Sequence, residues 1–223
     1  MKTKRLLIAA IAVMLILAIG VIGAVAWLLD QKTTTNTFTV GNVHLESLVE
    51  TVATDDDADG NYAFHLIPGS TYDMTPVVTV KGTSEAAYVR VIVTFTDAAD
   101  LISVLGTDTD SDGVRDAFLP HNYVGGWDDS VWVPVSTDAA DYKANSNNEV
   151  VVEFRYHEVV AKSDVNTTLP AVFTTFSVPG AVTNEGLAAI ADLEIGVVAH
   201  AIQAENLATA DDAWAAFDDQ VNP

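Results

Sequence analysis

A stretch of alternating aspartates has the residue types and the spacing of a calcium-binding loop. Residues 108–116 read Asp-Thr-Asp-Ser-Asp-Gly-Val-Arg-Asp, which matches the pattern D-x-D-x-D-G-x-x-D. Carboxylates at loop positions 1, 3, 5 and 9, a glycine at the turn and a main-chain carbonyl at position 7 suit calcium, a hard cation that takes about six to eight oxygen ligands. The predicted ligands are Asp108, Asp110, Asp112, Asp116 and, through its carbonyl, Val114.

This loop departs from an EF-hand at position 12, where Leu119 stands in place of the bidentate glutamate. Another residue or water must therefore complete the shell, and a solvated, aspartate-rich turn without a metal is the open alternative. A second copy of the pattern consists of Asp55, Asp57 and Asp59, followed by Gly60, but it lacks acids at both positions 9 and 12. The sequence thus predicts one calcium loop and a second, poorer candidate.

Catalytic motifs are weaker than the calcium loop. The nearest match to a zinc-peptidase helix begins at His157-Glu158, but Ala161 stands where the second histidine is needed, since two imidazoles four residues apart must reach one metal. The same stretch continues a predicted strand, so we expect His157 to be a strand-end side chain. The chain has no cysteine, which excludes thiolate sites, a cysteine nucleophile and disulfides. There is also no G-x-S-x-G elbow and no phosphate-binding glycine loop.

Three aromatic residues form a possible sugar-stacking group: Tyr123, Trp127 and Trp132. Aromatic side chains around a Gly-Gly turn more often make the packing cluster of a hairpin. We favour packing, and sugar binding stays as the alternative.

The composition indicates a folded, anionic protein. The 223-residue chain carries 31 Asp and Glu against 10 Lys and Arg, which gives a formal net charge of −21. This charge would repel a phosphate backbone, so nucleic acid is not an expected partner. Apolar residues make up 49% of the chain, too many for a disordered acidic segment. One domain of this length can bury a full hydrophobic core.

The first residues have the pattern of an export signal. Lys2, Lys4 and Arg5 precede an uncharged apolar run at 6–29, as in a leader whose basic end stays in the cytoplasm. Ala24 and Ala26 form an A-x-A cleavage pattern, so we expect a signal peptide at 1–26. An uncleaved anchor is the alternative, because a helix of this length spans a hydrocarbon layer of about 30 Å. Cleavage after Ala26 takes the formal net charge from −21 to −24, because it removes three basic residues and no acidic one.

From Asp30 onward, short apolar runs alternate with Gly, Pro, Asn and Asp clusters, which is typical of an all-β protein. In 88–95 the apolar residues at odd positions fall on one face and residues such as Arg90 on the other, as a period of two requires. We therefore predict a jelly-roll-like antiparallel β-sandwich whose sheets each have one face toward solvent. About nine strands are expected: 34–40, one from Val43, 62–67, 77–81, 88–95, 131–135, 150–156, 173–178 and 193–201.

Two short helices are expected among the strands. Residues 184–191 form an Ala/Leu turn behind a capping asparagine. Thr209 and Asp212 form a T-x-x-D capping box ahead of an Ala-rich helix that ends near Phe217. Trp214 and Phe217 would share one helix face, so we expect this C-terminal helix to dock on the sandwich.

The N-terminal strands change phase at Gly41-Asn42. Apolar residues stand at even positions 38 and 40 but at odd positions 43 and 45. Because one extra residue turns every later side chain to the opposite face, we expect a bulge or turn at this dipeptide. It would separate a strand at 34–40, preceded by a flexible threonine-rich lead, from the rest of the domain. That strand could pair within its own domain or with another chain.

Several segments, in their order along the chain, resemble the TasA/camelysin family. The resemblance covers nearly the whole chain, although each segment alone is a weak motif. One departure is Leu29, where the family usually has an aromatic residue before the aspartate. The matching segments are AWLLD at 26–30, TNTFTVGNV at 35–43, LIPGSTY at 66–72, AYVRV at 87–91, AIQAE at 201–205 and AWAAF at 213–217.

The resemblance implies a jelly-roll domain that a SipW-type signal peptidase releases to the cell surface or extracellular matrix. The best-known members form protein fibres of the biofilm matrix, in which the N-terminal strand of one subunit completes the sheet of the next. Carried over to this sequence, the donor segment is 27–43 and the β-sandwich domain is 44–223. The donor strand would consist of Asn36, Thr37, Phe38, Thr39 and Val40.

We therefore expect a secreted, non-enzymatic subunit of matrix or surface fibres, supported by calcium. Its expected partners are further copies of the chain in a head-to-tail polymer, the SipW-type peptidase and matrix polysaccharide. The first alternative is an exported calcium-dependent carbohydrate-binding or adhesive module. The second is a metallopeptidase, an activity described for camelysin members.

Overall fold

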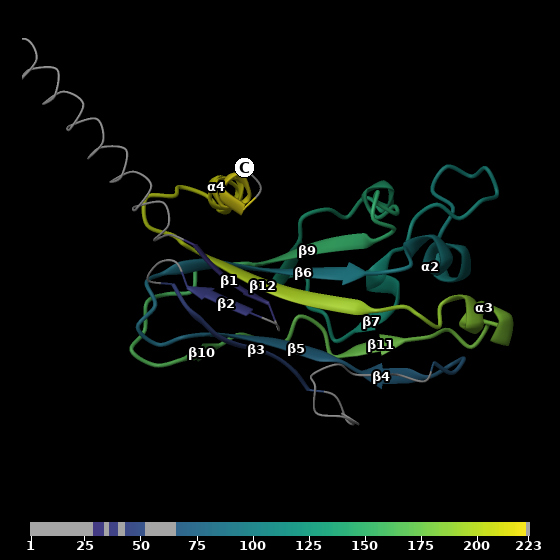
Figure 1. Cartoon of the computed structure of the whole chain (residues 1–223), viewed down its shortest axis with the longest axis horizontal. Coiled ribbons are helices and arrows are strands. Elements are labelled where there is room, and N and C mark those ends of the chain that lie inside the picture. Colours follow the sequence, from purple (N-terminus) through teal and green to yellow (C-terminus); the bar gives the residue numbers. More distant parts are fainter. Residues whose placement is uncertain (1–28, 34–35, 40–42, 52–65, 222–223) are drawn as a thin grey trace, which may run out of the picture.

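The computed structural model describes residues 29–33, 36–39, 43–51 and 66–221, which form two layers of antiparallel sheet with short helices (Figure 1). One layer is a six-stranded sheet in the order β2-β1-β12-β6-β9-β8. The other consists of two three-stranded sheets, β10-β5-β3 and β4-β11-β7. The predicted all-β sandwich with short helices is confirmed.

The elements have the following bounds. The six-stranded sheet contains β1 (Leu29–Thr33), β2 (Asn36–Thr39), β6 (Ala87–Phe95), β8 (Trp132–Pro134), β9 (Val150–Tyr156) and β12 (Ile195–Gln203). The smaller sheets contain β3 (Leu45–Thr51), β4 (Thr71–Asp73), β5 (Thr75–Val80), β7 (Val124–Gly125), β10 (Thr167–Thr168) and β11 (Thr175–Ser177). The helices are α2 (Ala98–Leu105), α3 (Asn184–Ala189) and α4 (Ala210–Val221), with 3-10 turns η1 (Pro120–Asn122) and η2 (Ala139–Asp141).

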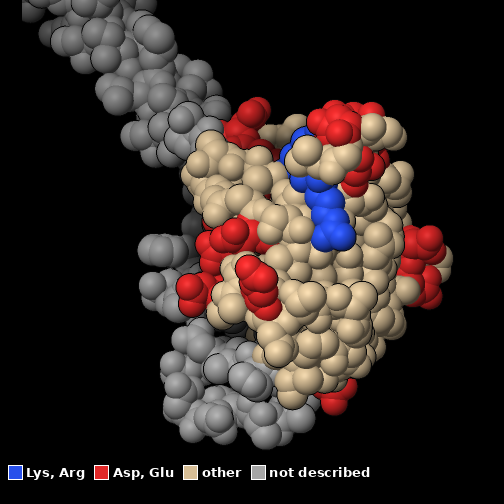
Figure 2. Space-filling view, turned by 90° about the vertical axis from the view of Figure 1, so that its right-hand side faces the viewer, with Lys and Arg blue, Asp and Glu red and all other residues tan. Residues whose placement is uncertain are grey.

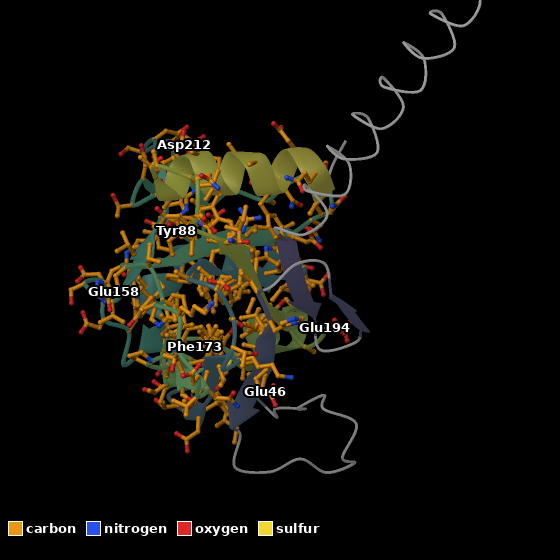
Figure 3. The ribbon with its side chains drawn as sticks, turned by 90° about the vertical axis from the view of Figure 1, so that its left-hand side faces the viewer. Glu46, Tyr88, Glu158, Phe173, Glu194 and Asp212 are labelled. Atoms are coloured by element: carbon orange, nitrogen blue, oxygen red, sulfur yellow. The ribbon has the colours of Figure 1, made fainter. Side chains whose placement is uncertain are left out.

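The core lies between the two layers and follows the predicted alternation. In β6 the side chains of Val89, Val91, Val93 and Phe95 are at most 1% exposed. The strands on either side continue this inner face, since Val91 is the Cα partner both of a β9 phenylalanine and of a β12 alanine. Figure 3 shows Phe173 deep between the layers, and its side chain is 1% exposed. A period of two therefore decides which side chains form the core.

Arg90 contradicts the expectation that the outer face of β6 is open to solvent. Its side chain is buried at 4% exposure, because α4 lies across the outer face of the large sheet (Figure 3). The apolar face of α4 contributes Ala213, Trp214 and Phe217, all at most 1% exposed. The predicted docking of the C-terminal helix on the sandwich is confirmed.

Hydrogen bonds at the helix starts explain where the two predicted helices begin. At α4 the Thr209 hydroxyl accepts from the Asp212 N–H at 3.1 Å and donates to the Asp212 carboxylate at 2.8 Å. The helix then continues past the predicted end to Val221. At α3 the N-cap is Thr183, whose hydroxyl accepts from a main-chain N–H, and not the predicted asparagine.

The structure has one helix that the sequence did not predict, and it describes one predicted strand only at its end. Helix α2 was not predicted, because an apolar run of this length fits a buried strand as well as a short helix. It begins after Asp97, whose φ of 47° lies in the left-handed region, and it buries Leu101 and Leu105. In the predicted strand 62–67, only Leu66 and Ile67 are described, and neither belongs to a strand.

The aromatic residues after η1 pack as predicted. Trp132 is fully buried and its Nε1–H donates to the Pro170 carbonyl at 2.9 Å. Tyr123 stacks on Phe118 with ring centroids 5.1 Å apart. Trp127 differs from these two because it is only partly buried and reaches a surface pocket.

Candidate assembly edge and acidic loop

The N-terminal segment forms a hairpin at one edge of the large sheet. β1 pairs with β12 from Leu29↔Ile202 to Lys32↔Ala199. Among the described strands β2 pairs only with β1, and it holds the predicted donor residues Asn36, Thr37, Phe38 and Thr39. Val40 lies outside the described residues. In a single chain, then, the predicted donor strand lies in its own sheet, which is the alternative that the sequence left open.

The hairpin shows that the prediction of a flexible lead before the first strand is wrong. A flexible lead was expected before residue 34, yet Leu29–Thr33 forms β1. The sequence of β1 has no apolar alternation of its own. Its place in the sheet therefore depends on pairing with the edge of β12 that β6 leaves open. Of the two described strands of the hairpin, β1 and not β2 pairs with β12.

β12 holds the hairpin through a short ladder. Four residue pairs join β1 to β12, whereas nine join β12 to β6 on its other side. Within 199–202 of β12 every residue is buried, because the sandwich core lies on one face and α4 on the other. If the hairpin left, β12 would present a formed edge with unpaired main-chain groups.

The opposite edge of this sheet, β8, is closed. The N–H of Trp132 donates to the Asp128 carbonyl at 2.9 Å, and the Trp132 carbonyl accepts from Trp127 Nε1 at 2.8 Å. Pro134 has no N–H to donate. An added strand would therefore find few partners at β8, as in natural sheets whose edges resist pairing.

Ionic contacts of the buried Arg90 side chain fix α4 to β6 and β9. The Arg90 guanidinium donates to Asp218 of α4 at 2.5 and 3.1 Å and to Glu153 of β9 at 3.3 Å. Its Cζ lies 4.5 Å from the ring centroid of Trp214 and 4.9 Å from that of Phe217. One cation, whose side chain is 5% exposed, thus joins β6, β9 and α4. Its partner Glu153 is 20% exposed and its partner Asp218 is 50% exposed, so solvent screens the contact with Asp218 more strongly.

His200 joins β12 to these contacts of Arg90. Its Nδ1 accepts from Arg90 Nε at 3.1 Å, and its ring stacks on Phe217 at 4.7 Å. Burial, followed by the neighbouring Arg90 charge, lowers the pKa of His200 from 6.5 to about 4, against a smaller opposing effect of Asp218. The imidazole is therefore neutral at pH 7, with its proton on Nε2, which is buried and has no hydrogen-bond partner among the described side chains. Neither Arg90 nor His200 stood out in the sequence.

The structure brings three of the predicted calcium ligands together. One carboxylate oxygen from each of Asp108, Asp110 and Asp112 lies within 4.8 Å of the others, and within the described part of the chain this is the one group of His, Asp or Glu so arranged. The loop that carries them projects between α2 and Ala117, and its ends are joined by a hydrogen bond from Thr107 N–H to the Ala117 carbonyl at 2.8 Å.

Main-chain hydrogen bonds shape this loop. The carboxylate of Asp108 accepts from the N–H groups of Ser111 at 2.7 Å and Gly113 at 2.8 Å, and the Gly113 bond is the main reason that the pKa of Asp108 is lowered. Gly113 has a φ of 92°, a backbone conformation that residues with a Cβ rarely adopt. On the face shown in Figure 2, acidic side chains gather in clusters on a largely uncharged surface.

The fourth predicted carboxylate, that of Asp116, does not belong to the group formed by Asp108, Asp110 and Asp112 and has other partners. Its carboxylate accepts from Lys143 Nζ at 2.6 Å, from Thr109 Oγ1 at 2.6 Å and from the Thr109 N–H at 2.9 Å. The Lys143 bond is the largest cause of a strongly lowered Asp116 pKa. Val114 is 63% exposed, so the loop is open to solvent at position 7.

The remaining predicted site residues divide into two groups. Ala24, Ala26, Asp55, Asp57 and Asp59 lie outside the described residues. His157 directly follows β9, where its ring packs on Tyr156 with centroids 4.8 Å apart, so the prediction of a strand-end side chain is confirmed.

No family model, curated protein or solved structure matches this chain. Within the described ranges, no helix is long and apolar enough to cross a membrane.

Proposed function

We propose that this chain is a secreted, non-catalytic structural subunit that polymerises by exchanging its N-terminal hairpin, as the resemblance to TasA/camelysin proteins implies. The observation that carries the proposal is the position of β1 and β2 as the terminal strands of one sheet edge. The unit exchanged would be the whole hairpin, because β1 is the one described strand with which β2 pairs. In the polymer, β1 of one subunit pairs with β12 of the next.

Exchange costs little free energy because the ladder is the same before and after it. The four β1–β12 pairs of the monomer are re-formed between subunits, so the polymer is favoured by concentration and by any new contact between neighbours. Donor and acceptor surfaces differ, so the contact is head-to-tail and produces an open filament. The closed edge at β8 supports head-to-tail assembly through the hairpin, because it disfavours the alternative in which complete sheets pair edge to edge.

Removal of an export leader would determine when the hairpin becomes free to exchange. While the apolar run at 6–29 remains in a membrane, the hairpin that begins at Leu29 stays tethered. Cleavage after Ala26 by a SipW-type peptidase would free it outside the cell. The extracellular matrix or cell surface is the proposed location.

Calcium at Asp108, Asp110 and Asp112 is the second part of the proposal. Three carboxylates so close together repel one another, and a divalent cation offsets this repulsion. Since the chain carries a formal charge of −21, calcium would also ease the approach of like-charged subunits.

Engineered cysteines test the exchange directly, because the chain has none of its own. Lys32 and Ala199 are opposite each other across β1 and β12, and directly opposed strand residues have Cα atoms about 4.5–5.5 Å apart, within disulfide range. In filaments of the Lys32→Cys/Ala199→Cys variant, oxidation should produce a ladder of covalent multimers on a non-reducing denaturing gel.

The matched control is Thr94→Cys/Gly196→Cys, which joins β6 to β12 within one chain in either model. Its disulfide should leave the denatured protein monomeric. Filaments whose 32–199 disulfide forms only within single chains would refute exchange. A chain that remains monomeric at high concentration after leader removal would refute polymerisation itself.

A further inference from the structure

A pocket of about 210 Å³ opens beside Trp127, at the edge of the large sheet opposite the N-terminal hairpin. Its floor is made of core side chains, Val152, Phe154 and Tyr142, which are 3–5% exposed. Pro120 and Pro134 form walls. Sites for drug-sized ligands measure about 300–1,000 Å³, so this pocket suits one ring and not a larger molecule.

Trp127 is held rigidly at this pocket. Its Nε1–H donates to the Trp132 carbonyl at 2.8 Å, and its ring meets Phe154 edge-on with centroids 5.5 Å apart. The indole N–H is thus already satisfied, and the ring itself is what a ligand would meet. A fixed aromatic ring on an apolar floor is a preorganised stacking surface.

Two free polar groups stand at the rim. The Thr137 hydroxyl and the His121 imidazole are exposed and make no hydrogen bond within the described part of the chain. Ser136 is different, because its hydroxyl donates to Asp141 at 2.5 Å and accepts from the Asp138 N–H at 3.0 Å. A ligand would therefore find an apolar floor with two hydrogen-bonding groups above it.

The pocket chemistry selects an uncharged ligand. No Asp, Glu, Lys or Arg lines it, so a charged group entering it would lose hydration without gaining a partner. The overall charge of −21 further disfavours anions. An extended peptide is disfavoured because β8, the strand that carries Pro134, has its outer main-chain groups already engaged at Trp132.

We propose that this pocket binds one neutral pyranose ring of a polysaccharide, with Trp127 as the stacking surface and His121 and Thr137 as hydrogen-bonding groups. The site is independent of strand exchange, since the hairpin leaves from the opposite sheet edge. A filament would then display one sugar site per subunit.

Fluorine NMR of the chain labelled with 5-fluorotryptophan tests this proposal with internal controls. The chain has four tryptophans, of which Trp132 and Trp214 are at most 1% exposed. Titration with the neutral oligosaccharides cellopentaose and laminaripentaose should shift the Trp127 resonance with at least one of them and leave those of Trp132 and Trp214 in place. Oligogalacturonate, an anionic probe, should cause no shift.

Rim variants separate binding from folding. His121→Ala and Thr137→Ala change exposed side chains, so the double variant should keep the wild-type melting temperature and bind the active oligosaccharide at least tenfold more weakly. Glu158→Gln, on an exposed side chain outside the pocket, is the matched control and should bind normally. Absence of a Trp127 shift with both neutral sugars at 10 mM would overturn the proposal. A shift with an aromatic dipeptide but with neither sugar would also overturn it and would assign the pocket to peptide side chains.

Discussion

Replacing His200 with asparagine tests how α4 is held on the sheet. Asparagine keeps an oxygen near the position of Nδ1, so it retains an acceptor for Arg90 Nε. It removes the titrating imidazole and its stack on Phe217. The lost ring costs stability at every pH, so the informative quantity is how the difference between the two proteins changes with pH.

The sign of the change in stability with pH follows from the lowered pKa of His200, which is about 4 in the folded protein against 6.5 for an unperturbed group. The unfolded chain binds a proton at His200 more readily than the folded chain does, so this group favours unfolding as pH falls from 6.5 toward 4. The loss is about 2 kcal/mol at pH 5 and levels off at about 3 kcal/mol below pH 4, at about 1.36 kcal/mol per pKa unit. Above pH 6.5 the full stability is present.

Urea unfolding at pH 7.5, 6, 5 and 4.5 measures this effect. Protonation of the acidic residues destabilises both proteins alike, so wild type should lose about 2 kcal/mol more than His200→Asn between pH 7.5 and pH 5. An NMR titration of the His200 imidazole should have its midpoint near pH 4. Parallel stability curves for the two proteins, or a midpoint near 6.5, would refute the account of His200 as a neutral group buried under α4.

Three further predictions concern calcium, a helix end and a helix cap. Calcium should raise the melting temperature of wild type at matched ionic strength, by about 2.7 kcal/mol of stability at 100 times the dissociation constant, and it should not change that of Asp110→Asn/Asp112→Asn. Coincident wild-type melts with calcium and with chelator would contradict this. Gly106→Ala should destabilise the fold by about 1–3 kcal/mol, because a Cβ there would lie 2.3 Å from the Ile102 carbonyl oxygen; an unchanged urea midpoint would count against it. Thr209→Ala should cost about 1 kcal/mol by removing the α4 cap, measured in the same way, with no loss indicating that the cap is dispensable.

The sequence predicts the faces of the strands better than their neighbours. Alternation in β6 and β9 places Val91, Phe95 and Val152 in the core, where the structure has them. This works because the direction of a side chain in a strand depends only on local geometry. Pairing partners depend on the whole chain, so β1, a polar strand placed by β12, carried no local signal.

The same limit explains why the cluster around Arg90 was missed. An arginine among alternating apolar residues indicates a solvent-facing position, and nothing near it in sequence contradicts that. Its partners, His200 and Asp218, are 110 and 128 residues away. The pocket beside Trp127 likewise joins residues from η1, β8 and β9. The calcium loop was easier, since Asp108 and its neighbours lie within one short segment.

α4 bears on the proposed exchange because it holds the acceptor edge in shape from within its own chain. Asp218 binds Arg90 of β6, Asp211 pairs with Arg155 of β9, and Phe217 stacks on His200 of β12. None of these contacts involves β1 or β2, so they persist when the hairpin leaves. β12 would then remain a formed strand, fixed to β6 by nine residue pairs and to α4 by the stacked ring, with only its outer main-chain groups open. An edge held in this way needs no refolding to accept the hairpin of a neighbour, so the cost of exchange falls on the donor segment alone.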